Sequence, residues 1–233
     1  MNNLNDILVF IKNLSVNTFG SYGLELIPVN KQTKNQTMQK NDFSDLLNIK
    51  LYNIVDMGLT FSAMIRLYEK GTKKTLRNKI LEELDNISKV PSNEAFNKIH
   101  FDFCRWGINN IFLAEKIKAG MIIKKRKPAS YGQIAKTLDV VLTVVVHYCQ
   151  WPNHEKSKEM SQWLNAAVDT KMMKLLKKSY PENFNRWPSS VEDVDENTYL
   201  DLQKLVHRFI QDEHDGDIIP VQFGDYYWNL LNR

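Results

Sequence analysis

The chain has 233 residues, and its 31 Lys and Arg against 27 Asp and Glu give a formal net charge of +4. With 43% hydrophobic and 25% charged residues, the composition is that of a globular protein and excludes an intrinsically disordered chain. A chain of this length can bury its own core without a metal or a disulfide. The net charge identifies no partner by itself, so the distribution of charge along the chain carries more weight.

The sequence predicts a cytoplasmic protein without a membrane anchor, a cofactor or a metal. Cys104 and Cys149 lie in apolar contexts, which is typical of reduced, buried thiols. Residues 1–20 lack the features of a secretory signal, and no stretch reaches the roughly 20 apolar residues of a membrane span. The chain also has no glycine-rich phosphate loop, nucleophile elbow, His-Glu-x-x-His or Cys-x-x-Cys motif.

Residues 1–41 are expected to form a separate N-terminal region. Apolar residues recur at helical spacing over residues 4–14, and residues 24–27 have the pattern of a short extended segment. Residues 30–41 contain too few apolar side chains to offset their ordering entropy by burial, which is typical of a polar linker. The main helical domain is therefore predicted to span residues 42–233.

The main domain is expected to consist of amphipathic helices, because its apolar residues recur three or four positions apart. The pattern predicts helices over residues 43–68, 76–87, 96–106, 108–118, 131–150, 154–167, 170–180 and 196–215, with a break at Gly107. Residues 43–68 are expected to form one long helix or two shorter ones broken near Gly58. A short extended stretch is expected at residues 218–223. The predicted fold class is all-α or predominantly α. It is a multi-helix orthogonal bundle around a central apolar helix of about residues 131–150, with at most two short extended segments.

The central segment has two interpretations. It resembles a helix-turn-helix, because Ala135 is small where two helices must approach each other and Val145 is apolar ten residues later. A recognition helix must present polar side chains to base edges, however, and the residues after Asp139 are mostly valine and leucine. A helix that is apolar on nearly all sides is normally buried. We therefore predict a core helix, with any DNA contact made by the basic loop beside it.

Positive charge is concentrated in one stretch that has no acidic residue, residues 116–136. Residues 121–130 are expected to form a loop, because Pro128 prevents a continuous helix. Lys and Arg contacts to phosphates supply most non-specific affinity for nucleic acids. The alternative is a solvated lysine-rich turn. The predicted nucleic-acid-binding residues are Lys116, Lys118, Lys124, Lys125, Arg126, Lys127 and Lys136.

Arg208 and His214 are separated by five residues. This spacing is similar to the Arg-x4-6-His pattern of HEPN-type ribonucleases, which are also helical bundles. The resemblance implies that the pair would lie in a cleft and act on the phosphate and 2′-hydroxyl of RNA. It covers only these two residues, and Phe209 follows the arginine where the family usually has a polar residue. A metal-independent ribonuclease using Arg208 and His214 is the alternative function, and an exposed helix end is the other interpretation of this pair.

Acidic residues near the end of the same predicted helix compensate the basic stretch. They are Asp212, Glu213, Asp215 and Asp217. Carboxylates in the last turn oppose the helix dipole at a cost of a few tenths of a kcal/mol each, which favours a basic partner there. A protein partner or a second copy of the chain is therefore expected to bind near Asp212. The third candidate function, after nucleic-acid binding and ribonuclease activity, is therefore that of a protein-interaction subunit in a larger assembly.

Overall fold

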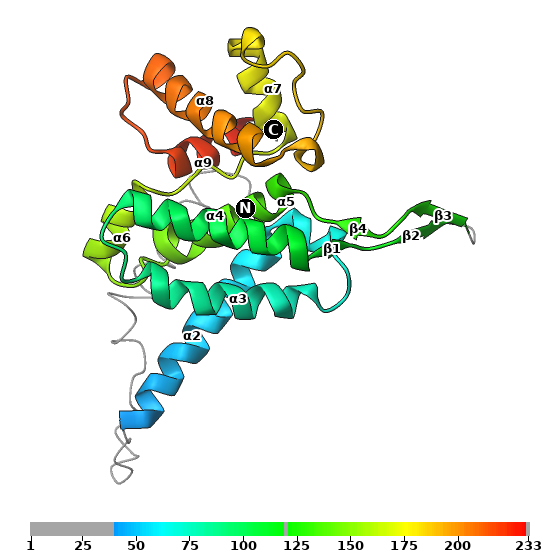
Figure 1. Cartoon of the computed structure of the whole chain (residues 1–233). Coiled ribbons are helices and arrows are strands. Elements are labelled where there is room, and N and C mark those ends of the chain that lie inside the picture. Colours follow the sequence, from blue (N-terminus) through cyan, green and yellow to red (C-terminus); the bar gives the residue numbers. More distant parts are fainter. Residues whose placement is uncertain (1–39, 119–120, 232–233) are drawn as a thin grey trace.

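The computed structural model describes residues 40–118 and 121–231, which form a predominantly α-helical fold (Figure 1). The helices are α2 (Lys40–Phe61), α3 (Thr72–Ile87), α4 (Asn93–Asn110), α5 (Tyr131–Leu142), α6 (His154–Ser161), α7 (Thr170–Ser179), α8 (Glu196–His214) and α9 (Pro220–Leu231). Shorter helical turns are η3 (Ala63–Leu67), the π-helical η4 (Thr143–Tyr148), η5 (Pro181–Asn183) and η6 (Val191–Asp193). The predicted fold class is confirmed. The predicted region 1–41 lies outside the described residues, except for its last two positions.

The central helix of the fold is α5 together with η4. Ser130 caps its start in a reciprocal capping box with Gln133, and the chain stays helical through Thr143 into η4. The helix contacts α2, α4 and α8, and most of its apolar side chains are buried. The predicted core helix is therefore confirmed. The helix-turn-helix interpretation is excluded, because the chain makes no turn at Asp139.

Two glycines let neighbouring helices approach α5 closely. A Cβ atom at Gly58 of α2 would lie 3.0 Å from the Cα of Val141, and one at Gly107 of α4 would lie 2.4 Å from Cγ2 of Ile134. Both helices continue through these glycines. The predicted break at Gly107 is therefore wrong, and the stretch 43–68 is broken at Ser62 and not at Gly58, because both glycines serve close packing and not helix termination.

Helices α7, α8 and α9 pack on one another as a group on one side of the molecule (Figure 1). The side chains of Asp169 and Asp195 accept backbone hydrogen bonds at the starts of α7 and α8, as their positions predict. The predicted extended stretch at residues 218–223 is wrong. Pro220 instead begins α9, a position that suits proline because the first helical residue needs no N–H donor.

The four strands of the described residues lie in one protruding segment, the β-arm, which we define as residues 112–118 and 121–128. Strand β1 (Phe112–Leu113) pairs with β4 (Lys127–Pro128), and β2 (Lys116–Lys118) pairs with β3 (Met121–Lys124), both antiparallel. Figure 1 shows β2 and β3 reaching away from the helices. The described extended residues lie in this arm and not at residues 218–223, whereas the predicted extended segment 24–27 lies outside the described residues. The helix over residues 108–118 and the loop over residues 121–130 are wrong, because α4 ends at Asn110 and the following chain is extended.

Candidate nucleic-acid interface

The inner end of the β-arm is fixed to the helical body through its backbone. Leu113 bridges to Tyr68, just after η3. The N–H of Ala114 donates to Leu67 at 2.9 Å, and the N–H of Glu69 donates to Phe112 at 3.0 Å. The β1–β4 pair therefore extends a short backbone ladder of the body, which sets the direction in which the arm leaves it.

Two acidic residues of the body neutralise the inner cations of the arm. Arg126 donates to both carboxylate oxygens of Glu69, at 2.6 and 3.1 Å, and its guanidinium lies 3.7 Å from the ring centre of Phe112. Lys127 binds the carboxylate of Glu192 in η6. The planar bidentate pair of Arg126 with Glu69 fixes geometry as well as charge, whereas Lys127 supplies a point charge. We therefore assign Arg126 and Lys127 a part in holding the arm, beside any contact they make with phosphate.

The outer cations of the arm are poorly neutralised. Lys116 and Lys124 are direct partners in the β2–β3 register, so two like charges lie opposite each other. Such a pair destabilises a ladder, and among the described residues the ion pair that offsets it is the distant one of Glu192, 3.9 Å from Nζ of Lys124. Within the part of the chain that the structure describes, neither Lys116 nor Lys125 forms an ion pair. This arrangement disfavours the isolated arm and favours an arm in contact with an anion.

The outer end of the arm also exposes a set of large apolar side chains, which we call the apolar tip. Its members and their exposed fractions are Ile117 (64%), Met121 (68%), Ile122 (54%) and Ile123 (56%). Every residue of β3 is exposed, so neither face of the outer ribbon packs on the body. This tip was not predicted from the sequence, because the lysines and the arginine of residues 121–130 indicated a charged loop.

The structure does not bring all the predicted cations together on the arm. The backbone of Lys118 ends β2, opposite Met121. Lys136 lies instead on α5, where it is largely buried and its Nζ is 3.6 Å from a carboxylate oxygen of Asp169. Burial lowers the pKa of Lys136, an effect that Asp169 opposes. Since Lys136 is engaged inside the body, the candidate interface omits it.

Arg208 and His214, the predicted ribonuclease pair, have separate partners. The guanidinium of Arg208 lies 4.5 Å from the ring centre of Tyr180, and its Nε is 3.5 Å from Asp212. Nε2 of His214 lies 3.0 Å from the hydroxyl of Tyr227 in α9. None of these contacts joins the arginine to the histidine. The ribonuclease function stays a prediction.

The acidic helix end is partly engaged within the chain. The hydroxyl of Tyr180 donates to Asp212 at 2.7 Å, and the same oxygen lies near Arg208. Burial and the hydrogen bond to Asp212 raise the pKa of Tyr180 to about 12. The backbone of Asp215 turns left-handed and ends α8. A partner near Asp212 would therefore meet a carboxylate that already has two internal contacts, and this partner stays a prediction.

A buried polar cluster, which the sequence did not indicate, joins α4, α5 and α8. Nε2 of His100 lies 2.8 Å from one carboxylate oxygen of Asp139, and the hydroxyl of Tyr199 donates to the other at 2.9 Å. Sγ of Cys104 lies 3.9 Å from Nδ1 of His100. Burial opposes the charging of His100, but the carboxylate of Asp139, which lies within hydrogen-bond distance, favours it and the pKa of His100 is raised. The cluster therefore holds an imidazolium–carboxylate pair inside the protein.

The thiol, imidazole and carboxylate of this cluster follow the order of a nucleophilic catalytic site. All of its side chains are at most 3% exposed, so a substrate has no access to them. Burial also raises the pKa of Cys104, which keeps the thiol protonated and weakens it as a nucleophile. We therefore interpret the cluster as a structural link between helices.

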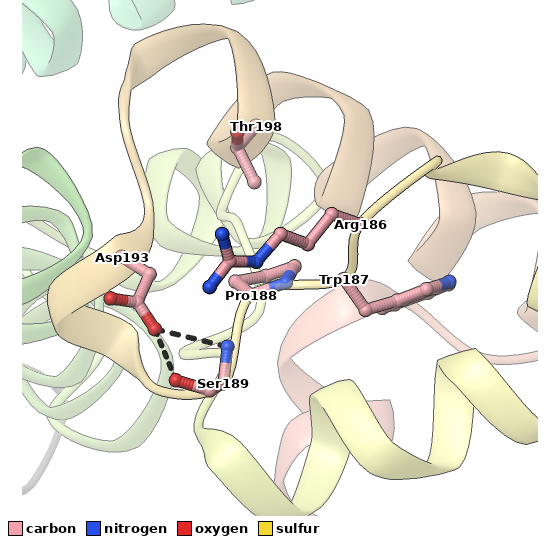
Figure 2. A pocket seen from close by; sticks show the side chains of 6 residues that line it. All are labelled: Arg186, Trp187, Pro188, Ser189, Asp193 and Thr198. Carbon is pink, nitrogen blue, oxygen red and sulfur yellow. Dashed lines mark hydrogen bonds between the residues drawn. The ribbon is translucent and has the colours of Figure 1, made fainter.

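A polar hollow of about 340 Å³ lies beside the loop that precedes α8 (Figure 2). Its lining residues are Arg186, Trp187, Pro188, Ser189, Asp193 and Thr198. The carboxylate of Asp193 accepts hydrogen bonds from the backbone N–H and the hydroxyl of Ser189, and these bonds lower its pKa. Figure 2 shows Arg186 reaching between Asp193 and Thr198. Because the carboxylate would repel an anion that Arg186 attracts, we assign the hollow no ligand.

Neither a metal site nor a membrane-spanning helix competes with the β-arm as the candidate interface in the described part of the chain. Among the described residues, no group of three or more His, Cys, Asp or Glu side chains is placed to hold a metal ion. None of the described helices combines the length and the apolar character needed to span a membrane. Comparison of the chain with protein-family models, with curated proteins and with solved structures finds no match.

Proposed function

We propose that the protein binds nucleic acid through the β-arm, with the outer lysines contacting the phosphate backbone. The observation that carries the proposal is the register pair of Lys116 and Lys124, with Lys125 beside it. Two like charges opposite each other on an exposed ribbon are unfavourable alone. A phosphate between them would turn this repulsion into two attractive contacts and release counterions from the nucleic acid.

The shape of the arm supports the same proposal. Strands rise about 3.3 Å per residue, so the five steps from Leu113 to Lys118 reach roughly 17 Å beyond the inner end. This exceeds the depth of either groove of duplex DNA, about 7.5 to 8.5 Å. The body can therefore stay outside the duplex while the outer lysines lie along its phosphates.

The binding test removes three outer charges together, in the variant Lys116→Ala/Lys124→Ala/Lys125→Ala. A labelled duplex DNA of about 30 base pairs, and a matched RNA duplex, are titrated by fluorescence anisotropy at several salt concentrations. We expect wild-type affinity to fall steeply with salt, and the variant to bind about 10-fold or more weakly with a salt slope lower by about 2 to 3.

The control variant, Lys174→Ala/Lys177→Ala/Lys178→Ala, loses the same charge from exposed positions of α7. It should keep wild-type affinity to within about 3-fold if the arm is the contact. Wild-type protein that binds neither duplex would remove the proposal. An equal loss in both variants would show a response to net charge alone, without a role for the arm.

A further inference from the structure

We infer that the apolar tip of the β-arm inserts between base pairs of duplex DNA from the minor groove and bends the duplex. The inference rests on the proposed function, since it names the nucleic acid and the contact that the arm makes. Its starting observation is that four large apolar side chains at the tip are each more than half exposed. A soluble domain rarely places so many of them together without an interaction that covers them.

The neighbours of the tip indicate what covers it. Ile117 lies between Lys116 and Lys118 in β2, and Ile123 is followed directly by Lys124 and Lys125. A partner that buries these apolar side chains must therefore also bind several lysines that lie within two residues of them in the sequence. Duplex DNA offers both surfaces, because phosphates line each groove and the faces of the base pairs are apolar once a step is opened. Isoleucine and methionine are among the side chains that act as wedges in such steps.

The cross-strand register brings the apolar side chains of the tip close together, as insertion between base pairs requires. Ile117 is paired directly with Ile122, so their Cβ atoms are about 5 Å apart. From this pair to the pair of Lys116 with Lys124, the chain advances one residue on β2 but two on β3. Ile123 is the extra residue, and such a bulge increases the local twist of the ribbon. The tip therefore presents several branched side chains within a short length of ribbon.

The chemistry of the tip favours the minor groove over the major groove. The four side chains have no hydrogen-bonding groups beyond the weak acceptor of methionine sulfur, so they cannot read the donors and acceptors of the major groove. The undistorted minor groove is about 6 Å wide, too narrow for a two-stranded ribbon. Entry of the tip therefore requires the groove to open, which a kink toward the major groove achieves at a cost of a few kcal/mol per unstacked step.

The test measures binding and bending on the same DNA. A duplex of about 30 base pairs carries a donor and an acceptor dye at its ends, so that bending raises energy transfer while anisotropy reports binding. The test variant, Ile117→Thr/Ile122→Thr/Ile123→Thr, keeps branched side chains that suit a strand and removes most of the apolar surface. We expect wild-type protein to raise energy transfer at saturation, and the variant to bind within about 10-fold of wild type with most of that rise lost.

A single-residue comparison controls for the loss of an exposed isoleucine elsewhere. Ile49 on α2 and Ile123 are both 56% exposed. Ile123→Thr should reduce the rise in energy transfer, whereas Ile49→Thr should leave it at the wild-type level. An equal effect of the two substitutions would overturn the assignment of the wedge to the tip.

The remaining outcomes separate this inference from the proposed function. Wild-type binding without a change in energy transfer, or binding to RNA alone, overturns the wedge and leaves phosphate binding by the arm intact. Absence of binding removes both. Wild-type protein is also tested by sedimentation with vesicles rich in anionic lipid and by analytical ultracentrifugation alone. Association there that the threonine variant loses, without DNA bending, would assign the tip to a membrane surface or to a second copy of the chain.

Discussion

His100 and Asp139 form an ion pair whose side chains are only 1% exposed each. Removing two charges from water is costly, and their attraction offsets this cost only when further hydrogen bonds satisfy both groups. Tyr199 supplies one such bond to Asp139 and stacks on the ring of His100 with 5.7 Å between ring centres. The pair therefore depends on all its members, and loss of one leaves an uncompensated charge in the core.

We predict that breaking this pair is much more costly than replacing it. His100→Leu and Asp139→Leu should each lower the free energy of unfolding by about 3 to 5 kcal/mol, measured by urea denaturation. The double variant should lose clearly less than the sum, because no charge is left unpaired. Additive losses would show that the two residues are not coupled.

Lys98 and Asp102 provide a surface control on the same helix. Their side chains are 77% and 51% exposed, and the two groups are 2.5 Å apart. Removing either should lower the free energy of unfolding by less than about 0.5 kcal/mol.

The loss of stability caused by His100→Leu should depend on pH. Since the folded pKa of His100 is raised, its contribution is complete below the unfolded value of about 6.5 and declines as pH rises through the folded value.

The sequence did not indicate this pair, because Asp139 lies 39 residues from His100 and 60 residues from Tyr199. His100 and Cys104 share one face of a predicted helix, which indicated only a core position. Asp139 next to an apolar run is equally typical of a helix cap or a turn residue. An aspartate at the start of a valine-rich run can instead signal a buried partner, since such a charge is tolerated inside only when it is paired.

At the level of elements, the contact between α4 and α5 depends on Gly107. A Cβ at this position would lie 2.4 Å from one carbon of Ile134 and 2.9 Å from another, so the helices must separate to admit it. We predict that Gly107→Ala lowers the free energy of unfolding by about 1 to 3 kcal/mol, an overpacking cost.

Gly224 in α9 is the matched position, because no atom lies within 4 Å of a Cβ there. Gly224→Ala should raise the free energy of unfolding by about 0.5 to 1 kcal/mol through helix propensity alone. Chemical denaturation of both variants checks the pair of predictions. Stabilisation by both substitutions would contradict the close contact at Gly107.

The β-arm shows where the sequence contained a signal that was not used. Ile117 between two lysines and the run from Met121 to Lys124 are short segments with strand propensity, separated by two residues that end in glycine. That is the pattern of a hairpin with a short connection. The apolar side chains of Ile108 and Ile111 continue the helical spacing of the preceding segment. They therefore obscure the change from helical to strand periodicity. The starts of helices are easier to predict from the sequence than this change of periodicity. Ser92, Asp169 and Asp195 all act as N-caps, as their positions predict.

For the whole molecule, the sequence predicted the fold class and the core helix but not the arrangement of the parts. Alternation of polar and apolar residues indicates which side of a helix is buried, not which helix covers it. The contacts that place the arm, from Glu69 to Arg126 and from Glu192 to Lys127, join segments 57 and 65 residues apart. The protein thus consists of a helical body, which supplies stability, and an exposed arm held on it by these contacts, which we propose supplies binding.

The most direct test of this division replaces residues 116–124 with Asn-Gly, which shortens the arm and keeps β1, β4 and both anchoring ion pairs. We predict that the midpoint of thermal unfolding stays within about 2 to 4 °C of wild type, the shift that ~1 kcal/mol would give. Anisotropy titration with duplex DNA should show a loss of affinity of at least about 10-fold, since the outer phosphate contacts are gone. A folded, shortened protein that binds DNA as tightly as wild type would contradict the account.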